Sequence, residues 1–422
     1  MILKHARTLL LAPFVFCLPG LHAQEINFRD VLNLAIANSP SIKAKEREFD
    51  ASNNALKGAQ WGRYPALSLS LSSNPTGVGG NLAPGTSSPS SSLRLDQPLY
   101  AWGAIDARIR TADLQRTVAK LSIQSEVNSV SDRIIASFGQ VITAQEKIII
   151  QQEAINRLVE FEGMIGRRLA TQLSSKNDAS LVNSRLQQAR SELVQSRSLE
   201  VRSRAQLEEI TGQSVKQKLI RSSASVGFEN LDALQMASVD SSSEFASARL
   251  GRDLAENQIK QRSADLFPKL SGRVERVNSP SAGLVYTQAY VVFEASLGNG
   301  LSQLEGVNES SSRLLAAEQQ IEVTRRTLFQ QSASTWADYV AYRDQAAILK
   351  DITQENEEIV ASFVRQYLAG KKSWLEVLNA ERELVQSRLQ MADLNSSLMS
   401  ATYRLQRLSG QLNISKETTL NE

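Results

Sequence analysis

The chain has 422 residues, with 47 basic and 44 acidic side chains, one cysteine and two histidines. The cysteine (Cys17) and both histidines (His5 and His22) lie within the first 23 residues. The rest of the chain therefore has no thiol and no imidazole, which excludes cysteine nucleophiles, histidine-based triads, structural zinc sites and disulfides there. The near balance of charge gives no electrostatic reason to expect nucleic acid binding.

Residues 1–23 have the pattern of a secretory signal peptide. Lys4 and Arg7 precede a short apolar core, and Leu21 to Ala23 form a plausible cleavage site. The small residues of a lipoprotein box are missing before Cys17, so we expect no lipid anchor. Beyond this segment there is no run of about 18 apolar residues, so no membrane-spanning helix is expected. We predict an exported chain that begins near Gln24.

Residues 24–212 form the first of two predicted repeats. A helix over residues 28–60, interrupted at Pro40, is followed by a β-hairpin over residues 66–99. Its apolar residues alternate with polar ones, the signature of a two-faced strand: Leu67, Leu69, Leu71, Leu93, Leu95 and Leu99. Between the strands, residues 73–92 are almost wholly Ser, Gly, Pro, Asn and Thr, which predicts a long mobile loop.

A long helix over residues 105–168 follows the hairpin. Apolar residues recur in it at every seventh position, which indicates coiled-coil packing: Val127, Ile134, Val141, Ile148 and Ile155. At about 1.5 Å per residue, such a helix is a rod on the order of 100 Å long. A shorter helix over residues 177–211 returns about half that distance and ends at Gly212.

The second repeat, residues 213–410, has the same plan. We predict a helix over 231–264, a hairpin over 269–297, a long helix over 302–368 and a short helix over 374–409. The return strand of this hairpin should place alternate residues on one face, namely Ala289, Val291, Phe293, Ala295 and Leu297. Residues 411–422 form a polar C-terminal tail.

The ends of the long helices identify the duplication. The segments Arg167–Arg190 and Arg365–Arg388 align at an offset of 198 residues, and the offset continues to Gly212 and Gly410. Gly370 is the usual residue just past a helix C-terminus, and Ser373 with Glu376 has the spacing of a capping box. Each segment is therefore predicted to be the tip of a helical hairpin, in a body of two equivalent halves.

The strands and the aromatic residues beside them suggest a membrane site. One two-stranded hairpin is marginal in water, and lipid does not tolerate an unpaired sheet edge, so closure would need several chains. Trp and Tyr favour the bilayer interface. We therefore predict an aromatic girdle at the helix-proximal ends of the hairpins, made of Trp61, Tyr64, Tyr100, Trp102 and Phe267. The alternative is that these residues cap a soluble helix–strand junction.

Two motifs stand out in this plan, one after the first hairpin and one at the second tip. They are Gln97-Pro98-Leu99-Tyr100 followed by Gly103, and Tyr367-Leu-Ala-Gly370 continuing to Trp374-Leu-Glu-Val-Leu378. With the duplicated plan, they make the chain similar to the TolC family of trimeric outer-membrane channel proteins over essentially its whole mature length.

The resemblance implies a mainly α fold with a β-barrel portion. A long coiled-coil α-helical barrel would carry four transmembrane strands per chain, completed by trimerisation to 12 strands. Such a homotrimer would lie in outer-membrane lipid of a Gram-negative bacterium, with its tunnel in the periplasm. Its tips would dock to a periplasmic adaptor (membrane fusion) protein bound to an inner-membrane pump or ABC transporter, and the channel would be the passive exit duct.

The resemblance also suggests site residues. Tyr367 falls on a gating tyrosine, Lys372 on a gating arginine, and Asp178 on an aspartate to which that arginine links. Glu376 and Asn379 fall on two aspartates that ring the periplasmic entrance; because one is neutral here, we expect weaker cation binding than the family pattern gives. The tips expected to dock the adaptor comprise Leu169, Ala170, Thr171, Leu368, Ala369 and Gly370.

Other readings stay open at the level of sequence. The charged residues near the second tip could simply be a solvated helix start, and the whole chain could be a soluble periplasmic coiled-coil scaffold or adaptor. A hydrolase has no localised carboxylate pair to support it. No catalytic, cofactor-binding or metal-ligating residue is predicted. The cargo could be small-molecule drugs or a secreted protein such as an adhesin, with the overall look nearer to type I secretion.

Overall fold

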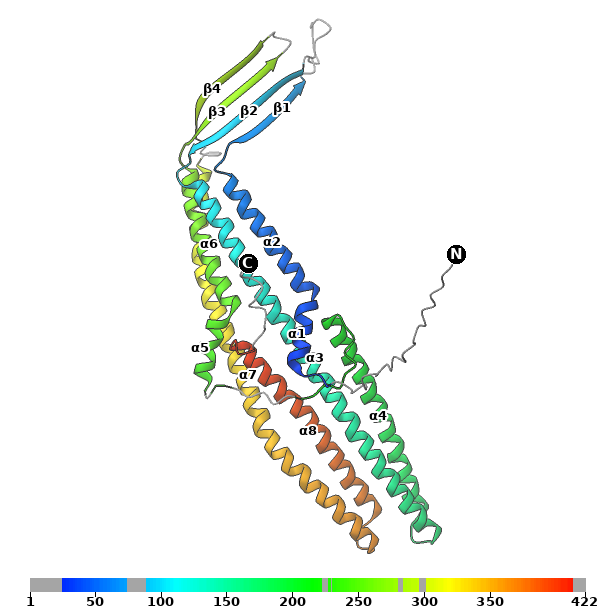
Figure 1. The fold of residues 1–422 in the computed structure, drawn as a ribbon. Coiled ribbons are helices and arrows are strands. Elements are labelled where there is room, and N and C mark those ends of the chain that lie inside the picture. Colours follow the sequence, from blue (N-terminus) through cyan, green and yellow to red (C-terminus); the bar gives the residue numbers. More distant parts are fainter. Residues whose placement is uncertain are drawn as a thin grey trace, which may run out of the picture.

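The computed structural model describes residues 25–73, 89–221, 227–228, 230–279, 284–295 and 301–412. The molecule is elongated and mainly helical, with a small sheet at one end and two helical hairpin tips at the other (Figure 1). The predicted signal peptide and all of the predicted tail beyond residue 412 lie outside the described residues. No helix in the described part combines the length and the apolar character needed to span a bilayer.

The first half contains α1 (Phe28–Asn38), α2 (Pro40–Trp61), β1 (Ala66–Ser73), β2 (Pro89–Tyr100), α3 (Ala104–Ala170) and α4 (Lys176–Thr211). Pro40 occupies the first turn of α2, where its missing N–H costs no helical hydrogen bond. Trp102 and Gly103 both have positive φ, 52° and 84°, and turn the chain from β2 into α3. Gly212 ends α4 in the left-handed conformation that glycine adopts without strain.

The second half repeats this order with α5 (Leu231–Ser241), α6 (Ser243–Asp265), β3 (Lys269–Ser279), β4 (Leu284–Glu294), α7 (Ser302–Leu368) and α8 (Trp374–Leu408). The single helix predicted over 231–264 is wrong, because Ser242 leaves the helical conformation with ψ 118°. Its hydroxyl accepts a hydrogen bond from the Phe245 N–H and so caps α6. Both halves thus have a broken helix before their hairpin.

The four strands form one antiparallel sheet in the order β1-β2-β3-β4, so the two halves meet where β2 pairs with β3. The predicted loop over 73–92 is too long, because β2 begins at Pro89 and its Ser90 and Ser92 pair with serines of β1. The rest of that loop, residues 74–88, lies outside the described residues. The hydroxyl oxygens of Ser72 and Ser90 lie 2.7 Å apart. Strand β4 ends at Glu294, so Ala295 is not part of it, and Leu297 lies outside the described residues.

The sheet has two chemically different faces. Residues directly opposite each other in neighbouring strands lie on the same face. One face carries large apolar side chains whose exposed fractions run from 39% at Leu95 to 75% at Leu71, namely Leu67, Leu69, Leu71, Leu93, Leu95, Val274, Val291 and Phe293. The other face carries serines and ion pairs. The apolar face of the sheet is therefore open to its surroundings.

The helical body has its main core where α1 crosses α3, with Phe28 between Phe138 and Tyr403 at ring-centroid distances of 5.4 and 3.8 Å. The heptad positions of α3 are mostly buried, including Val127, Ile134 and Val141. The equally long α7 buries only Ser310, Leu328, Ser332, Val360 and Tyr367. The two long helices are thus alike in length, at 67 residues each, and unlike in burial.

Candidate functional site: the helical tips and the aromatic girdle

The two tips have the same local structure. Each returning helix starts with a complete capping box, in which a serine hydroxyl accepts from the backbone N–H three residues on and the carboxylate there accepts from the serine N–H. Ser175 and Asp178 form the box of α4, with distances of 3.1 and 3.0 Å. Ser373 and Glu376 form that of α8, with distances of 3.4 and 2.9 Å. The duplication therefore extends to individual hydrogen bonds.

Tyr367 joins the two tips within one chain. Its hydroxyl lies 2.8 Å from the Oγ of Ser174, which belongs to the turn between α3 and α4. The Arg168 guanidinium carbon lies 5.0 Å from the centroid of the tyrosine ring, close enough for a cation–π contact. Only 7% of Tyr367 is exposed. The predicted gating tyrosine thus holds the end of α7 against the first tip, through two residues that sequence reasoning missed.

Trp374 is the centre of the apolar core at the tips. It is 2% exposed and packs on Phe161 and Tyr367 at ring-centroid distances of 5.3 and 4.9 Å. Val377 and Leu378, three and four residues later, lie on the same side of α8 and join the cluster. This cluster contains residues of α3, α4, α7 and α8. The two hairpins therefore end as one packed unit.

Lys372 lies in the turn before α8 and has its ion partner in the first turn of that helix. Its Nζ lies 2.7 Å from Glu376 Oε1 and 4.6 Å from the centroid of the Phe363 ring. Hydrogen bonds from Lys372, and then from the backbone and hydroxyl of Ser373, lower the pKa of Glu376 to about 2. Asp178 is occupied in its own capping box. Within one chain, the predicted Lys372–Asp178 pair is not formed, because Lys372 pairs with Glu376 in the first turn of α8.

The remaining tip residues lie on the surface. Asn379 is half-buried on α8, one turn beyond the start of the helix. Of the residues predicted to dock an adaptor, Leu169 is half-buried and the others are exposed, namely Ala170, Thr171, Leu368, Ala369 and Gly370. Leu173 and Leu375 add exposed apolar side chains that were not predicted. The ends of both hairpins therefore present small and apolar residues.

An ion-pair network that is buried only at Glu381 lies behind the tips. Arg157 Nε on α3 donates to Glu381 Oε1 on α8 at 2.7 Å, and Glu381 is 3% exposed. Arg388 on α8 bridges Glu153 on α3 and Glu357 on α7, each at 2.9 Å. Burial raises the pKa of Glu381, and the charge of Arg157 opposes that shift. The network ties three helices together, and heptad spacing gives no sign of it.

The predicted aromatic girdle forms two groups at the base of the sheet. Tyr100, Trp102 and Phe267 are in contact, with ring centroids 5.0 and 4.9 Å apart, and the Trp102 indole N–H donates to the Pro268 carbonyl at 2.8 Å. Trp61 and Tyr64 form a separate pair at 5.0 Å. All five side chains are exposed. The first group joins the two repeats at the point where helices become strands.

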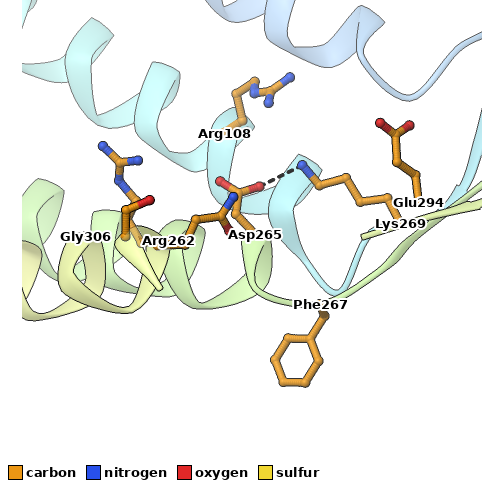
Figure 2. A pocket seen from close by; sticks show the side chains of 9 residues that line it. Arg108, Arg262, Asp265, Phe267, Lys269, Glu294 and Gly306 are labelled. Carbon is orange, nitrogen blue, oxygen red and sulfur yellow. Dashed lines mark hydrogen bonds and ion pairs between the residues drawn. The ribbon is translucent and has the colours of Figure 1, made fainter. Parts of the chain in front are cut away.

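A cavity of about 460 Å³ lies beside this girdle, between α3, α6, α7 and the start of the sheet. Figure 2 shows Arg108, Arg262, Asp265 and Lys269 around it, while Phe267 points away from them. Lys269 Nζ contacts Asp265 at 2.8 Å. The lining mixes both signs of charge. Among the residues that the structure describes, no group of three or more His, Cys, Asp or Glu is placed to hold a metal ion.

Comparison with known proteins gives the family. The model of the outer membrane efflux protein family matches residues 31–213 and again 237–411, once for each repeat. The cobalt-zinc-cadmium resistance protein CzcC of Cupriavidus metallidurans is 22% identical over 410 residues, which cover 92% of this chain and 91% of CzcC.

Solved structures share the fold. CusC superposes with a TM-score of 0.79 at 15% identity, over 96% of this chain and 98% of CusC. The outer membrane protein VceC of Vibrio cholerae superposes with a TM-score of 0.76 at 16% identity, over 91% and 96% of the two chains. The family match covers both repeats and so confirms the resemblance and the internal duplication. The chain belongs to the outer membrane efflux protein family.

Proposed function

We propose that three copies of this chain form an outer-membrane channel, the passive exit duct of a tripartite efflux system. The observation that carries the proposal is the sheet, with one exposed apolar face and one polar face above an aromatic girdle. Within the sheet, β1 and β4 pair on one side only. Because lipid does not tolerate open edges, β4 of one copy would pair with β1 of the next, and three copies would close a barrel of 12 strands.

The unequal burial of the long helices supports the same assembly. In the lone chain α7 exposes apolar residues along its length, including Leu315, Val323, Ile348 and Ile359. A second copy packed against this side would remove them from water, as coiled-coil partners do. The α helices of three copies would then form a tunnel on the order of 100 Å long. A soluble monomeric scaffold would leave both this helix and the sheet uncovered.

The girdle supports a position for the membrane. Aromatic residues at the helix-proximal ends of the strands would lie at one membrane interface, and we propose that this is the inner one, with the helices in the periplasm. The tips would meet a periplasmic adaptor through their exposed residues, and that adaptor would link the duct to an inner-membrane pump. Tyr367, Lys372, Asp178, Glu376 and Asn379 would form the gate there. A gate held by a few weak contacts can be opened by a partner that binds the open state better.

The relatives bear on cargo. The family is named for efflux and CzcC for cobalt-zinc-cadmium resistance, so we propose small solutes or metal ions as cargo, in place of the secreted protein that the sequence favoured. The metal would pass through as substrate and is not a resident cofactor. The energy would come from the inner-membrane partner. We propose no catalytic step for this chain.

Reconstitution with a pair of matched variants tests the proposal. Purified protein in a planar bilayer should give stable conductance steps. Leu69→Arg should abolish them, since a charge facing lipid near the bilayer centre costs about 2–4 kcal/mol in each copy. Ser70→Arg, the next residue on the polar face, should still give channels. Folded wild-type protein that gives no channels, or channels equally tolerant of arginine at both positions, would contradict the proposal.

A further inference from the structure

The polar face of the sheet carries a ladder of ion pairs across the junction of the two repeats. Arg94 on β2 and Glu275 on β3 are directly opposite in the register, and their side chains lie 3.0 Å apart. Asp96 and Arg273, the next pair on this face, are also bonded. Tyr290 on β4 donates its hydroxyl proton to Glu275 at 3.2 Å. Adjacent pairs have opposite polarity, so the two strands alternate in charge.

The described part of the polar face is electrically balanced. Lys269 and Glu294 are opposite each other on the same face, closer to the helices. Together with the ladder they give three basic and three acidic side chains on this face: Arg94, Lys269, Arg273, Asp96, Glu275 and Glu294. Arg276, one residue after Glu275, lies on the apolar face opposite Leu93. The alternation of strand side chains separates it from the ladder.

We propose that this ladder sets the ionic selectivity of the outer-membrane section of the channel, with Arg94 and Glu275 as the determining residues. The inference rests on the proposed function, because the polar face becomes the lining of a lumen only when three copies close the sheet. Each copy then contributes a compensated set of charges, and the lumen favours neither cations nor anions. The ladder lets a wide duct pass solutes of either sign.

The size of the pore makes single charges effective. Twelve strands spaced about 4.8 Å apart and tilted by about 40° enclose a lumen whose axis is roughly 10 Å from the wall. The Debye length is also about 10 Å at 0.1 M salt, so three uncompensated charges are only partly screened at the axis. Their combined potential shifts the ratio of cation to anion permeability by about fourfold, from Coulomb's law in water reduced by one Debye length.

Two variants that break the same ion pair give opposite predictions. Glu275→Gln keeps the size and an acceptor for Tyr290 but leaves three extra positive charges per trimer, so the potassium-to-chloride permeability ratio should fall about fourfold. Arg94→Gln should raise the ratio by about the same factor. The double variant should restore the wild-type ratio. If the ion pair only stabilises the sheet, both single variants should change the conductance, or the yield of folded protein, in the same direction.

The measurement is the reversal potential in a tenfold potassium chloride gradient up to 0.1 M, read at the largest conductance level, where the tips contribute least resistance. Arg276→Gln is the matched control, since it removes a positive charge from the other face and should leave the ratio unchanged. Channels in which Arg94→Gln and Glu275→Gln leave the ratio unmoved, or in which Arg276→Gln shifts it equally, would overturn this inference alone. Folded wild-type protein without channels would overturn the proposed function as well.

Discussion

The Tyr367 hydroxyl gives the sharpest test of the gate. Tyr367→Phe removes the 2.8 Å hydrogen bond to Ser174 and keeps the ring between Arg168 and Trp374. A hydrogen bond of this kind contributes about 0.5–1.5 kcal/mol net. Ser174 is half-buried and can turn to water, which places the loss in the lower half of that range, at about 0.5–1 kcal/mol. The tips of each copy would separate about two to five times more readily.

In a trimer three such bonds act together. If the tips open as one unit, the losses add to about 1.5–3 kcal/mol, and the open population rises about 10- to 150-fold. Single-channel recording in a planar bilayer should therefore show a higher open probability and more frequent large conductance steps. Tyr339→Phe is the control, because it makes the same chemical change on α7 about 40 Å from the tip. An open probability that stays at the wild-type value in Tyr367→Phe would refute the role of this hydroxyl.

Lys372→Ser separates two forms of the gate. Its partner within the chain is Glu376, four residues later at the same tip, so losing that pair alone should change the open probability little. A large effect would show that Lys372 also pairs with a neighbouring copy, as the family resemblance implies for Asp178. Combining Lys372→Ser with Tyr367→Phe should give conductance at least as high as Tyr367→Phe alone.

Three further predictions concern stability. Trp374→Ala should lower the unfolding free energy by about 3–5 kcal/mol in detergent, while Leu375→Ala, at an exposed position, should change it by less than about 0.5 kcal/mol. Ser373→Ala and Ser175→Ala should each destabilise the first turn of their helix, α8 and α4, by about 1 kcal/mol. Amide hydrogen exchange in the two first turns should increase equally. An increase in only one of them would contradict the equivalence of the tips. Because burial raises the pKa of Glu381, its contribution to stability is complete below pH 4.5 and is lost as the pH rises through the raised value. The free energy of urea unfolding of Glu381→Gln, relative to that of the wild type, should therefore be higher at pH 7.5 than at pH 4.5. Equal differences at the two pH values would contradict the raised pKa.

The helices were predictable because their signals are local and repeated. The heptad positions of α3 from Val127 to Val141 are buried in the structure, and the spacing of Ser373 and Glu376 gave the capping box that α8 has. The Lys372–Glu376 pair is equally local, since Lys372 lies two residues before the start of α8 and four residues before its partner. The duplication repeats the capping box and the order of elements in the other half. Periodicity therefore accounts for most of the helical architecture.

The misplaced boundaries have physical causes that hydrophobic pattern does not record. Residues 89–92 pair with β1, and Ser90 and Ser92 lie on the polar face, so this stretch resembles a loop in composition although its backbone is in a strand. Ser242 breaks the helix through a side-chain cap inside a run of serines, and each serine there is an equally good candidate. At both places the boundary of the element is set by hydrogen bonds and not by the spacing of apolar residues.

The side-chain contacts at the tips and on the sheet depend on how distant segments are aligned. Ser174 meets Tyr367 across 193 residues, and Arg94 meets Glu275 across 181. The first contact requires the rotation of one hairpin against the other, and the second requires the register of β2 on β3. Neither quantity is contained in a local pattern. The sequence could therefore name Tyr367 as a gate residue by resemblance and could not name its partner.

The measurement that most directly tests the central claim is the oligomeric mass of the detergent-extracted protein, taken together with its membrane fraction. We predict a trimer that is recovered from the outer membrane and dissociates when the sample is heated. A water-soluble monomer or dimer in the periplasm would contradict it. In that case the exposed apolar face of the sheet and the uncovered side of α7 would need another explanation than closure by three copies.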